Sequence, residues 1–413
     1  MFDDPSGAGA APFASPSAGL VSARRAGFVV AIPVKDEEER LPACLRALTH
    51  QRDPSGRQIP PALISIVLFA NNCADRSASL ARALAERWSL TIRIVEASLP
   101  ASSAHAGHAR RAAMDLAEGW LEEKGERHGV ILTTDADSQV APNWITENMR
   151  AFESGADAVL GCVNLDDERK HLPRALHWRG KLEDAYEGLL TELSWLLDPL
   201  EHNPWPHHAT ISAASLGITR VAYCRVGRLP PIPLGEDKAL IALLSREDAR
   251  IRYCPTVHVT TSGRINGRAP GGVADTLRIR STDPEAPCDE ALEPFGTAFT
   301  RALWRGRFRR LHGAGRLALE SEWAAELGIA ARQVNEITKE AAFGYAWRLV
   351  EDRSPLLARQ LLRPAELPEQ ISIARRSVAR LRRSRFKRGT TRPDETENID
   401  ATARRGISIQ LAQ

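Results

Sequence analysis

The chain has 413 residues, 43% of them hydrophobic, so it can bury a sizeable core, and its length predicts two or three structural units. A formal net charge of only +3 argues against a strongly basic nucleic-acid-binding protein. No apolar run approaches the roughly 20 residues that a membrane-spanning helix needs, so we expect at most a peripheral contact with membranes.

The six cysteines are widely spaced and include no Cys-x-x-Cys pair, which argues against zinc knuckles and against a compact disulfide scaffold. In the first 25 residues, the small residues precede Arg24 and Arg25 instead of following them, so a disordered lead-in is a better interpretation than a secretory signal. These features predict a cytoplasmic protein with reduced thiols.

Strand and helix patterns alternate through the first third of the chain. Continuous apolar runs predict buried strands, and apolar residues at helical spacing predict the helices between them. The predicted strands cover residues 28–34, 63–69, 91–97 and 130–134, and the predicted helices cover 37–49, 77–87 and 104–123. This order predicts an α/β fold with a mainly parallel sheet, helices on both faces, and ligands at the carboxyl ends of the strands.

The pattern is less regular after the fourth strand. Further strands are predicted at 156–163, 211–219 and 251–260, and further helices at 143–152, 172–197 and 237–245. Pro255 interrupts the last of these strands, which suits mixed or antiparallel additions to the sheet. We expect a disordered lead-in (1–25), a sheet domain (26–275), a helical Arg-rich extension (276–388) and a flexible tail (389–413).

The most informative motif is Asp135-Ala136-Asp137, which comes directly after a predicted strand. Two carboxylates at the carboxyl end of a strand offer the oxygen ligands that a divalent cation prefers, and such a cation would in turn hold phosphate oxygens. Acidic pairs also end strands or begin helices without any ligand, and Ser138 and Asn143 suit that alternative.

Two earlier turns carry polar side chains at the same edge of the predicted sheet. Asp36 and Glu37 follow the first strand, where they suit contact with a ligand, although the helix dipole favours acids there in any case. Asn71, Asn72 and Asp75 follow the second strand, and their side chains suit either recognition of a nucleobase edge or an ordinary turn.

Two more positions lie near predicted helix starts. Arg110 belongs to the helix ahead of the acidic motif, where its charge would neutralise a diphosphate or simply face solvent. Glu236 and Asp237 follow Gly235 at the start of a later helix. A carboxylate at such a position is either a helix cap or a general base, and spacing alone favours the cap.

Taken in chain order, five short motifs resemble the motif series of family 2 glycosyltransferases. They are Ile32 to Glu38, Asn71 to Asp75, Ala109-Arg110, Asp135 to Asp137 and Gly235 to Asp237. The resemblance covers roughly residues 28–275, and it rests on the order of the motifs more than on any one of them. It implies a GT-A fold and transfer of a sugar from a nucleotide diphosphate donor to an acceptor hydroxyl, with inversion at the anomeric carbon.

The resemblance also implies roles for individual residues. Asp137, together with Asp135, would hold Mg²⁺ or Mn²⁺, and Asp237 would be the general base. The residues that would contact the donor are Asp36, Glu37, Asn71, Asn72, Asp75, Arg110, Asp135 and Glu236. Asn71 and Asn72 stand where paired acids are common in the family, so the sugar and nucleotide stay open, as do the acceptor and the linkage.

Two alternatives to glycosyl transfer remain. A protein that binds a nucleotide sugar without catalysis would keep the pocket, but the presence of both Asp137 and Asp237 argues against it. A sugar nucleotidyltransferase also places metal-bound acids on an α/β sheet, but no Gly-rich phosphate loop follows the first strand. The two enzymes differ in product, because glycosyl transfer releases a nucleoside diphosphate and nucleotidyl transfer releases pyrophosphate.

Arginines are concentrated in the predicted extension, at residues 301–310 and again at 371–388. Peripheral contact with an anionic membrane through these clusters is a hypothesis, and a solvated helical face is the alternative. The expected partners are a nucleotide-sugar donor and a glycan, lipid or small-molecule acceptor, with no nucleic acid.

Overall fold

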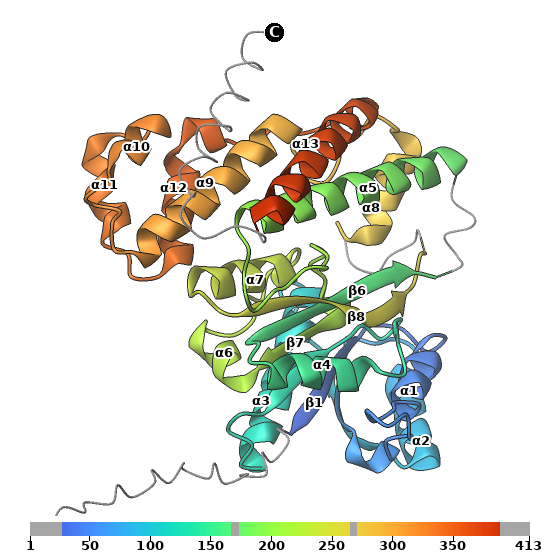
Figure 1. Ribbon diagram of the computed structural model, residues 1–413. Coiled ribbons are helices and arrows are strands. Elements are labelled where there is room, and N and C mark those ends of the chain that lie inside the picture. The colour runs from blue at the N-terminus through green and yellow to red at the C-terminus, as the bar shows by residue number, and fades with distance from the viewer. Residues whose placement is uncertain (1–26, 167–172, 265–270, 389–413) are drawn as a thin grey trace, which may run out of the picture.

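The computed structural model describes residues 27–166, 173–264 and 271–388 (Figure 1). The predicted lead-in (1–25) and the predicted tail (389–413) lie outside these ranges. Helices cover the sheet, and most helices of the C-terminal part of the chain lie together beyond one side of it (Figure 1). Within the described residues, no helix is both long enough and apolar enough to cross a membrane.

Among the described residues, eight strands form one sheet: β1 (Phe28–Val34), β2 (Ser65–Asn71), β3 (Thr91–Ala97), β4 (Val130–Thr133), β5 (Gln139–Val140), β6 (Ala158–Leu165), β7 (Leu216–Thr219) and β8 (Ile251–Thr261). Their order across the sheet is β3-β2-β1-β4-β7-β6-β8-β5. The first four strands are mutually parallel, as the alternation of strands and helices predicts. β7 runs antiparallel to β4 and β6, whereas β8 runs parallel to β6 and antiparallel to β5.

Two sets of helices cover the two faces of the sheet. One set is α1 (Leu41–Thr49), α2 (Ser77–Trp88) and α4 (Trp144–Glu153), and the other is α3 (Ala106–Glu123), α6 (Arg220–Arg225) and α7 (Glu236–Arg246). β1 supplies both cores, because successive side chains of a strand point to opposite faces. Val30 and Ile32 pack with the first set, and Val29 and Ala31 pack with the second. All four are fully buried, which explains the continuous apolar run in the sequence.

The C-terminal extension forms two further cores. Its helices are α8 (Val273–Thr282), α9 (Phe295–Gly313), α10 (Glu322–Glu326), α11 (Ala331–Thr338), α12 (Phe343–Arg353) and α13 (Leu367–Arg388). One core surrounds Phe308 and Trp323, between α9 and α12. The other joins α9 and α13 to α5 (Arg174–Leu197), which lies beside α13 in Figure 1. The extension is therefore built around a helix that comes from the first part of the chain.

A pair of hydrogen bonds fixes the extension to the helix α7 of the sheet domain. The carboxylate of Asp248, just after α7, accepts from the backbone N–H groups of Phe343 at 2.7 Å and Gly344 at 2.8 Å. These groups belong to the first turn of α12, where N–H groups have no partner within the helix. The position of α7 is thus tied to the extension as well as to the sheet.

The structure confirms the predicted fold class, a mixed sheet flanked by helices with a helical C-terminal extension. The observed strands differ from the predicted ones in detail: β2 and β6 lie two residues later than predicted, and β5 was not predicted. Only Leu216–Thr219 of the predicted strand at 211–219 joins the sheet, because Ala213–Ser215 form a single 3-10 turn. The pairing of β6 with β8 shifts between Gly161 and Cys162, so the segment around Pro255 bulges out of the ladder.

Candidate active site

The turns after β1 and β2 hold each other at the carboxyl ends of these strands. Oδ1 of Asp36 accepts from the N–H of Ala74 at 2.6 Å, and the N–H of Glu38 donates to Oδ2 of Asp75 at 2.9 Å. Oδ1 of Asp75 also accepts from Oγ of Ser77, at 2.6 Å. The structure therefore brings Asp36 and Asp75 together at one edge of the sheet, as expected for neighbouring parallel strands.

The two asparagines at the end of β2 have different surroundings. The amide of Asn72 exchanges two hydrogen bonds with the backbone of Leu99, each at 2.9 Å, and so holds the segment after β3. Asn71 is only 3% exposed, and its Oδ1 has no hydrogen-bond partner among the described residues. Because a buried acceptor without a partner is unfavourable, Asn71 is the better of the two for meeting a ligand.

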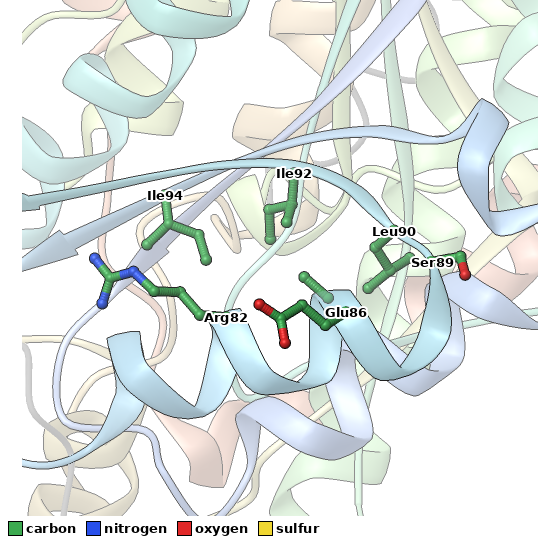
Figure 2. Close-up of a pocket in the computed structure, with 7 residues that line it drawn as sticks. Arg82, Glu86, Ser89, Leu90, Ile92 and Ile94 are labelled. Atoms are coloured by element: carbon green, nitrogen blue, oxygen red, sulfur yellow. The ribbon is translucent and has the colours of Figure 1, made fainter.

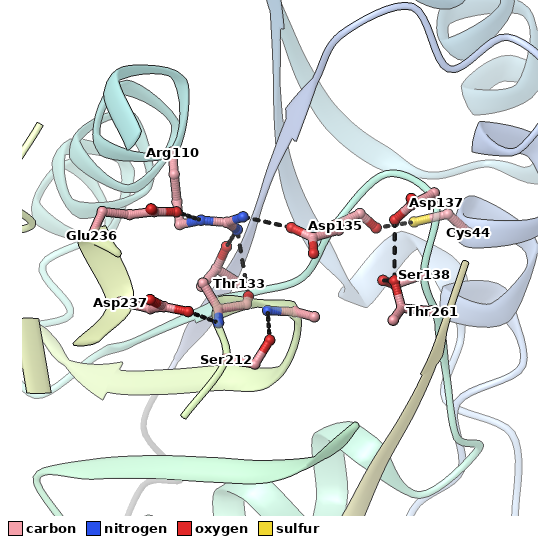
Figure 3. Close-up of polar contacts among 12 residues, drawn as sticks. Cys44, Arg110, Thr133, Asp135, Asp137, Ser138, Ser212, Glu236, Asp237 and Thr261 are labelled. Atoms are coloured by element: carbon pink, nitrogen blue, oxygen red, sulfur yellow. Dashed lines mark hydrogen bonds and ion pairs between the residues drawn. The ribbon is translucent and has the colours of Figure 1, made fainter. Parts of the chain in front are cut away.

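Arg110, on α3, is the centre of a polar network (Figure 3). Its Nη2 lies 2.5 Å from Oδ1 of Asp135, and its Nε lies 3.2 Å from Oε1 of Glu236. Its Nη1 donates to Oγ1 of Thr133 at 3.1 Å and to the carbonyl of Ala213 at 3.4 Å. Burial opposes the charge of Arg110, but the carboxylates of Asp135 and Glu236 outweigh it and raise the pKa of the guanidinium.

Asp137 and Glu37 meet through Arg264, which follows β8. Oδ2 of Asp137 lies 3.1 Å from Nη2 of Arg264, and Oδ1 accepts from Oγ1 of Thr261 at 3.3 Å. The two terminal nitrogens of Arg264 also donate to the two oxygens of Glu37, at 3.1 and 2.6 Å. Burial and the nearby charge of Asp135 raise the pKa of Asp137 to about 6, although Arg264 opposes the rise.

Asp237 lies in the first turn of α7 and does not cap that helix. The N-cap residue is Gly235, whose left-handed φ of 75° favours glycine and which offers no side chain for capping. Oδ2 of Asp237 accepts from the N–H of Ala213 at 3.1 Å, and Oδ1 accepts from the N–H of Lys238 at 2.7 Å. The helix cap that spacing alone favoured is therefore wrong. The Asp237 carboxylate instead lies against the segment that precedes β7 (Figure 3).

The network places the acids of two separate segments around one edge of the sheet. Arg110 joins Asp135 to Glu236, and Ala213 joins Arg110 to Asp237 through its carbonyl and its N–H. Every residue that the sequence singled out therefore belongs to one of three connected groups at the carboxyl ends of the parallel strands. The groups are the β1 and β2 turns, the Arg110 network, and the Glu37–Arg264–Asp137 contact.

The donor set at the acidic motif suits a hard divalent cation. Mg²⁺ is commonly held by one or two carboxylates together with substrate phosphates, and Asp135 and Asp137 offer such carboxylates. One oxygen of Asp135 contacts Arg110, and one oxygen of Asp137 contacts Arg264. The residues present thus fit a cation that donor phosphates complete, and Arg264 lies against one of the carboxylates that would hold it.

Another group of metal-ligating side chains lies in the first two turns. Ligand atoms of Asp36, Cys73 and Asp75 lie within 4.8 Å of one another. Both of these carboxylates already accept backbone N–H groups, so hydrogen bonding between the turns accounts for the cluster.

Two histidines of the loop after α5, His207 and His208, pack into an aromatic cluster. The ring of His207 lies 5.6 Å from that of Trp205, and the ring of His208 lies 5.7 Å from that of Tyr253. Burial lowers the pKa of His208 to about 4, and its Nε2 bonds to the carbonyl of Leu160 at 3.2 Å. These contacts give the histidines a structural role in the packing of β6 and β8.

A groove of about 600 Å³ lies between α2 and β3 (Figure 2). Its lining includes Arg82, Glu86, Ile92 and Ile94. None of the residues that the motifs singled out lines it, so the groove is separate from the candidate active site.

No motif in the sequence points to a role for Arg264, Thr133 or Thr261. Arg264 contacts Glu37 across 227 positions of sequence, and no local pattern connects the two. The one signal in the sequence is that Arg264 follows a predicted strand, as the residues of the acidic motif do.

Comparison with known proteins gives one family match. Residues 29–212 match the model of glycosyl transferase family 2. No curated protein sequence matches the chain significantly.

Many solved structures show a distant likeness to the chain, and two of them illustrate it. One is residues 1–349 of S. aureus TarS in complex with UDP-GlcNAc, with 14% identity and a TM-score of 0.42 over 86% of this chain and 91% of that chain. The other is the mannosyltransferase PcManGT from Pyrobaculum calidifontis in complex with GDP-Man and Mn²⁺, with 16% identity and a TM-score of 0.40 over 79% of this chain and 87% of that chain. At these TM-scores, neither likeness carries an argument about the site.

The family match is a property of the sequence and does not depend on the likeness to solved structures. It includes the four parallel strands, the turns after β1 and β2, Arg110 and the acidic motif, and it ends before Glu236 and Asp237. The family that the order of the motifs resembles is confirmed. Residues 29–212 match glycosyl transferase family 2, and this match identifies that part of the chain as a glycosyltransferase region.

Proposed function

We propose that the protein transfers a sugar from a nucleoside diphosphate donor to an acceptor hydroxyl, with inversion at the anomeric carbon. The observation that carries this proposal is the Arg110 network. It holds Asp135, from the end of β4, and Glu236, from the start of α7, around one buried guanidinium. A donor-side acid and Glu236, the residue next to the candidate base Asp237, are thereby held in one site, although they come from distant parts of the chain.

Asp237 is the proposed general base. Its carboxylate is oriented by the N–H groups of Ala213 and Lys238, and the residue is half-buried at the start of α7. The acceptor oxygen forms a bond to the anomeric carbon as the bond from that carbon to the diphosphate breaks, and the hydroxyl proton passes to Asp237. Attack from the face opposite the leaving group inverts the anomeric centre.

The turns after β1 and β2 are the proposed binding site for the donor nucleotide. Asp36, Glu37 and Asp75 supply carboxylates there. Asn71 supplies a buried amide oxygen that has no hydrogen-bond partner among the described residues. Such groups suit the hydroxyls of a ribose and the edge of a base. Asn72 supports this site by holding Leu99.

We place the proposed divalent cation, Mg²⁺ or Mn²⁺, at Asp137, with Asp135 beside it. When bound, such an ion neutralises charge on the leaving diphosphate. Arg110 keeps its own charge in the buried site because two carboxylates surround it, so it orients Asp135 towards the same region. The cation and Arg110 have separate tasks in this proposal.

Binding and product analysis with a panel of nucleotide sugars tests the proposal. We expect one nucleotide sugar to bind more tightly when Mn²⁺ is present, and its nucleoside diphosphate to be released when an acceptor is supplied. Release of pyrophosphate from a nucleoside triphosphate and a sugar phosphate would point to nucleotidyl transfer instead. Tight binding of a nucleotide sugar without hydrolysis or transfer, across a broad set of acceptors, would point to a non-catalytic binding protein.

We further propose that the protein works in the cytoplasm and meets anionic membranes through α13. The exposed side of this helix carries Arg375, Arg376, Arg380 and Arg383. Each basic residue near an anionic surface contributes about 1 kcal/mol of attraction. Removing α13 would also remove part of a buried core, so the test replaces these four arginines with glutamine. Flotation with phosphatidylserine vesicles should fall for the variant, and unchanged flotation would contradict the proposal.

A further inference from the structure

Arg264 is built into the candidate cation site. Its guanidinium spans Glu37 and Asp137, with two hydrogen bonds to the first at 3.1 and 2.6 Å and a 3.1 Å contact with the second. All three side chains are largely buried, with exposed fractions of 21% for Arg264, 7% for Glu37 and 15% for Asp137. Forked contacts between arginine and carboxylates are strong and geometrically specific.

The backbone on either side of Arg264 is also held in place. The N–H of Gly263 donates to Oδ1 of Asp166 at 3.0 Å, and the N–H of Arg264 donates to Oγ of Ser262 at 3.2 Å. These contacts aim the side chain at the acidic motif. The guanidinium is therefore a fixed part of the site and is not a surface arginine that happens to lie nearby.

A divalent cation and Arg264 would compete for the carboxylate of Asp137. One oxygen of Asp137 contacts Arg264, and the other accepts a hydrogen bond from Thr261. A cation that binds Asp137 must therefore bind an oxygen that already has a partner. The guanidinium and the cation also repel each other at so short a range. Both cannot occupy the same side of the Asp137 carboxylate.

We propose that Arg264 is a cation-site residue that neutralises Asp137 and Glu37 in the metal-free protein and is displaced from Asp137 when a divalent cation binds. This inference rests on the metal position proposed above. It explains how two buried carboxylates remain stable next to Asp135 before a cation arrives. It also assigns a role to a residue that lies outside the part of the chain matched by the family model.

Titration with Mn²⁺ alone, in the absence of any nucleotide, tests the inference. Free Mn²⁺ is measured by electron paramagnetic resonance for the wild type and for Arg264→Gln, Arg264→Lys and Asp137→Asn. The matched control is Arg93→Gln, which also removes one positive charge, but from the surface pair of Arg93 with Glu123. Thermal unfolding of each variant shows whether it is folded, and Arg264→Lys keeps the charge in case the neutral variant does not fold.

We expect Arg264→Gln to bind Mn²⁺ about tenfold more tightly than the wild type, because displacing a charge-assisted hydrogen bond no longer opposes the cation. Arg264→Lys should lie between the two, because a lysine cannot form the forked contact. Arg93→Gln should match the wild type. The double variant Asp137→Asn, Arg264→Gln should not show the tighter Mn²⁺ binding that is expected of Arg264→Gln alone.

Two results would overturn the inference in different ways. If Arg264→Gln binds Mn²⁺ no more tightly than Arg93→Gln, while Asp137→Asn weakens binding, the metal site stands and the competition is wrong. If Asp137→Asn binds as well as the wild type, or if no variant binds Mn²⁺, the proposed metal position fails together with the inference.

Discussion

Nε of Arg110 donates to Oε1 of Glu236 across 3.2 Å, although the two residues are 126 positions apart in the sequence. Arg110 belongs to α3 and Glu236 begins α7, so this contact joins the helix ahead of the acidic motif to the helix that carries Asp237. The same guanidinium contacts Asp135 at 2.5 Å. One buried arginine therefore sets the positions of the acidic motif and the start of α7 relative to each other.

Replacement of Arg110 by methionine should destabilise the protein strongly. Removing one partner of a buried ion pair leaves uncompensated charge, which costs about 3–5 kcal/mol of unfolding free energy. Arg348→Met, which breaks the exposed pair with Asp352, should cost only about 0.2–1 kcal/mol. Urea unfolding measures both changes. Equal losses for the two variants would show that the Arg110 network contributes no more than a surface pair.

Replacement of Asp237 by asparagine should abolish turnover and leave donor binding intact. Loss of a general base lowers kcat by about 10²- to 10⁴-fold. The donor contacts proposed for the β1 and β2 turns do not involve this side chain, so the dissociation constant of the donor should change little. Steady-state kinetics and calorimetry separate the two quantities, with Asp53→Asn as a control at the exposed turn after α1. Full transfer by the Asp237 variant would rule out its role as base.

Gly107 in α3 should tolerate no side chain, whereas Gly119 in the same helix should. A Cβ on Gly107 would lie 1.9 Å from the carbonyl oxygen of Ile232, in the segment that leads to α7. Gly107→Ala should therefore shift that segment, lower kcat/KM and cost about 1–3 kcal/mol of stability. A Cβ on Gly119 meets nothing within 4 Å, so Gly119→Ala should stabilise the helix by about 0.5–1 kcal/mol. Equal effects of the two substitutions on activity would contradict the proposed close approach.

The stability of the protein should fall in acid because of His208. Burial, with smaller contributions from His207 and Arg252, lowers the pKa of His208 from 6.5 to about 4. The unfolded chain therefore binds more protons than the native protein between these pH values, and stability is present above pH 6.5 and lost as the pH falls towards 4. The loss attributable to this residue is at most about 3 kcal/mol.

Replacement of His208 by glutamine tests the pH dependence. A glutamine amide can still donate to the carbonyl of Leu160 but does not titrate. Unfolding free energies measured at pH 7 and pH 4.5 should differ less for the variant than for the wild type. If the two proteins lose the same stability between these pH values, His208 does not account for the acid sensitivity.

Much of the fold could be predicted from the sequence because its signals are local. Buried strands such as Phe28–Val34 are continuous apolar runs, and their parallel order follows from the helices between them. The strand predicted at 211–219 was harder, because Ala213 has an apolar neighbourhood typical of a strand but uses its backbone groups to bind Arg110 and Asp237. That demand comes from residues far away in the sequence.

The candidate site could be predicted only as a set of acids and amides at strand ends. The sequence favoured Asp237 as a helix cap, yet Gly235 holds the cap position in the structure. The sequence also treated Asn71 and Asn72 alike, whereas Leu99 engages only the second. In each case the deciding partner belongs to another segment, so spacing within the motif could not reveal it.

The sequence by itself determined the family, the alternation of parallel strands with helices and the residues at the carboxyl ends of the strands, because hydrophobic periodicity and short motifs are properties of neighbouring positions. The tertiary structure alone decided which charges meet. Arg264 reaches Glu37 and Asp137, and Arg110 reaches Asp135 and Glu236, because the folded chain brings distant segments to one edge of the sheet. Electrostatic contacts of this kind depend on distance in space and on burial, and neither is written in the local sequence.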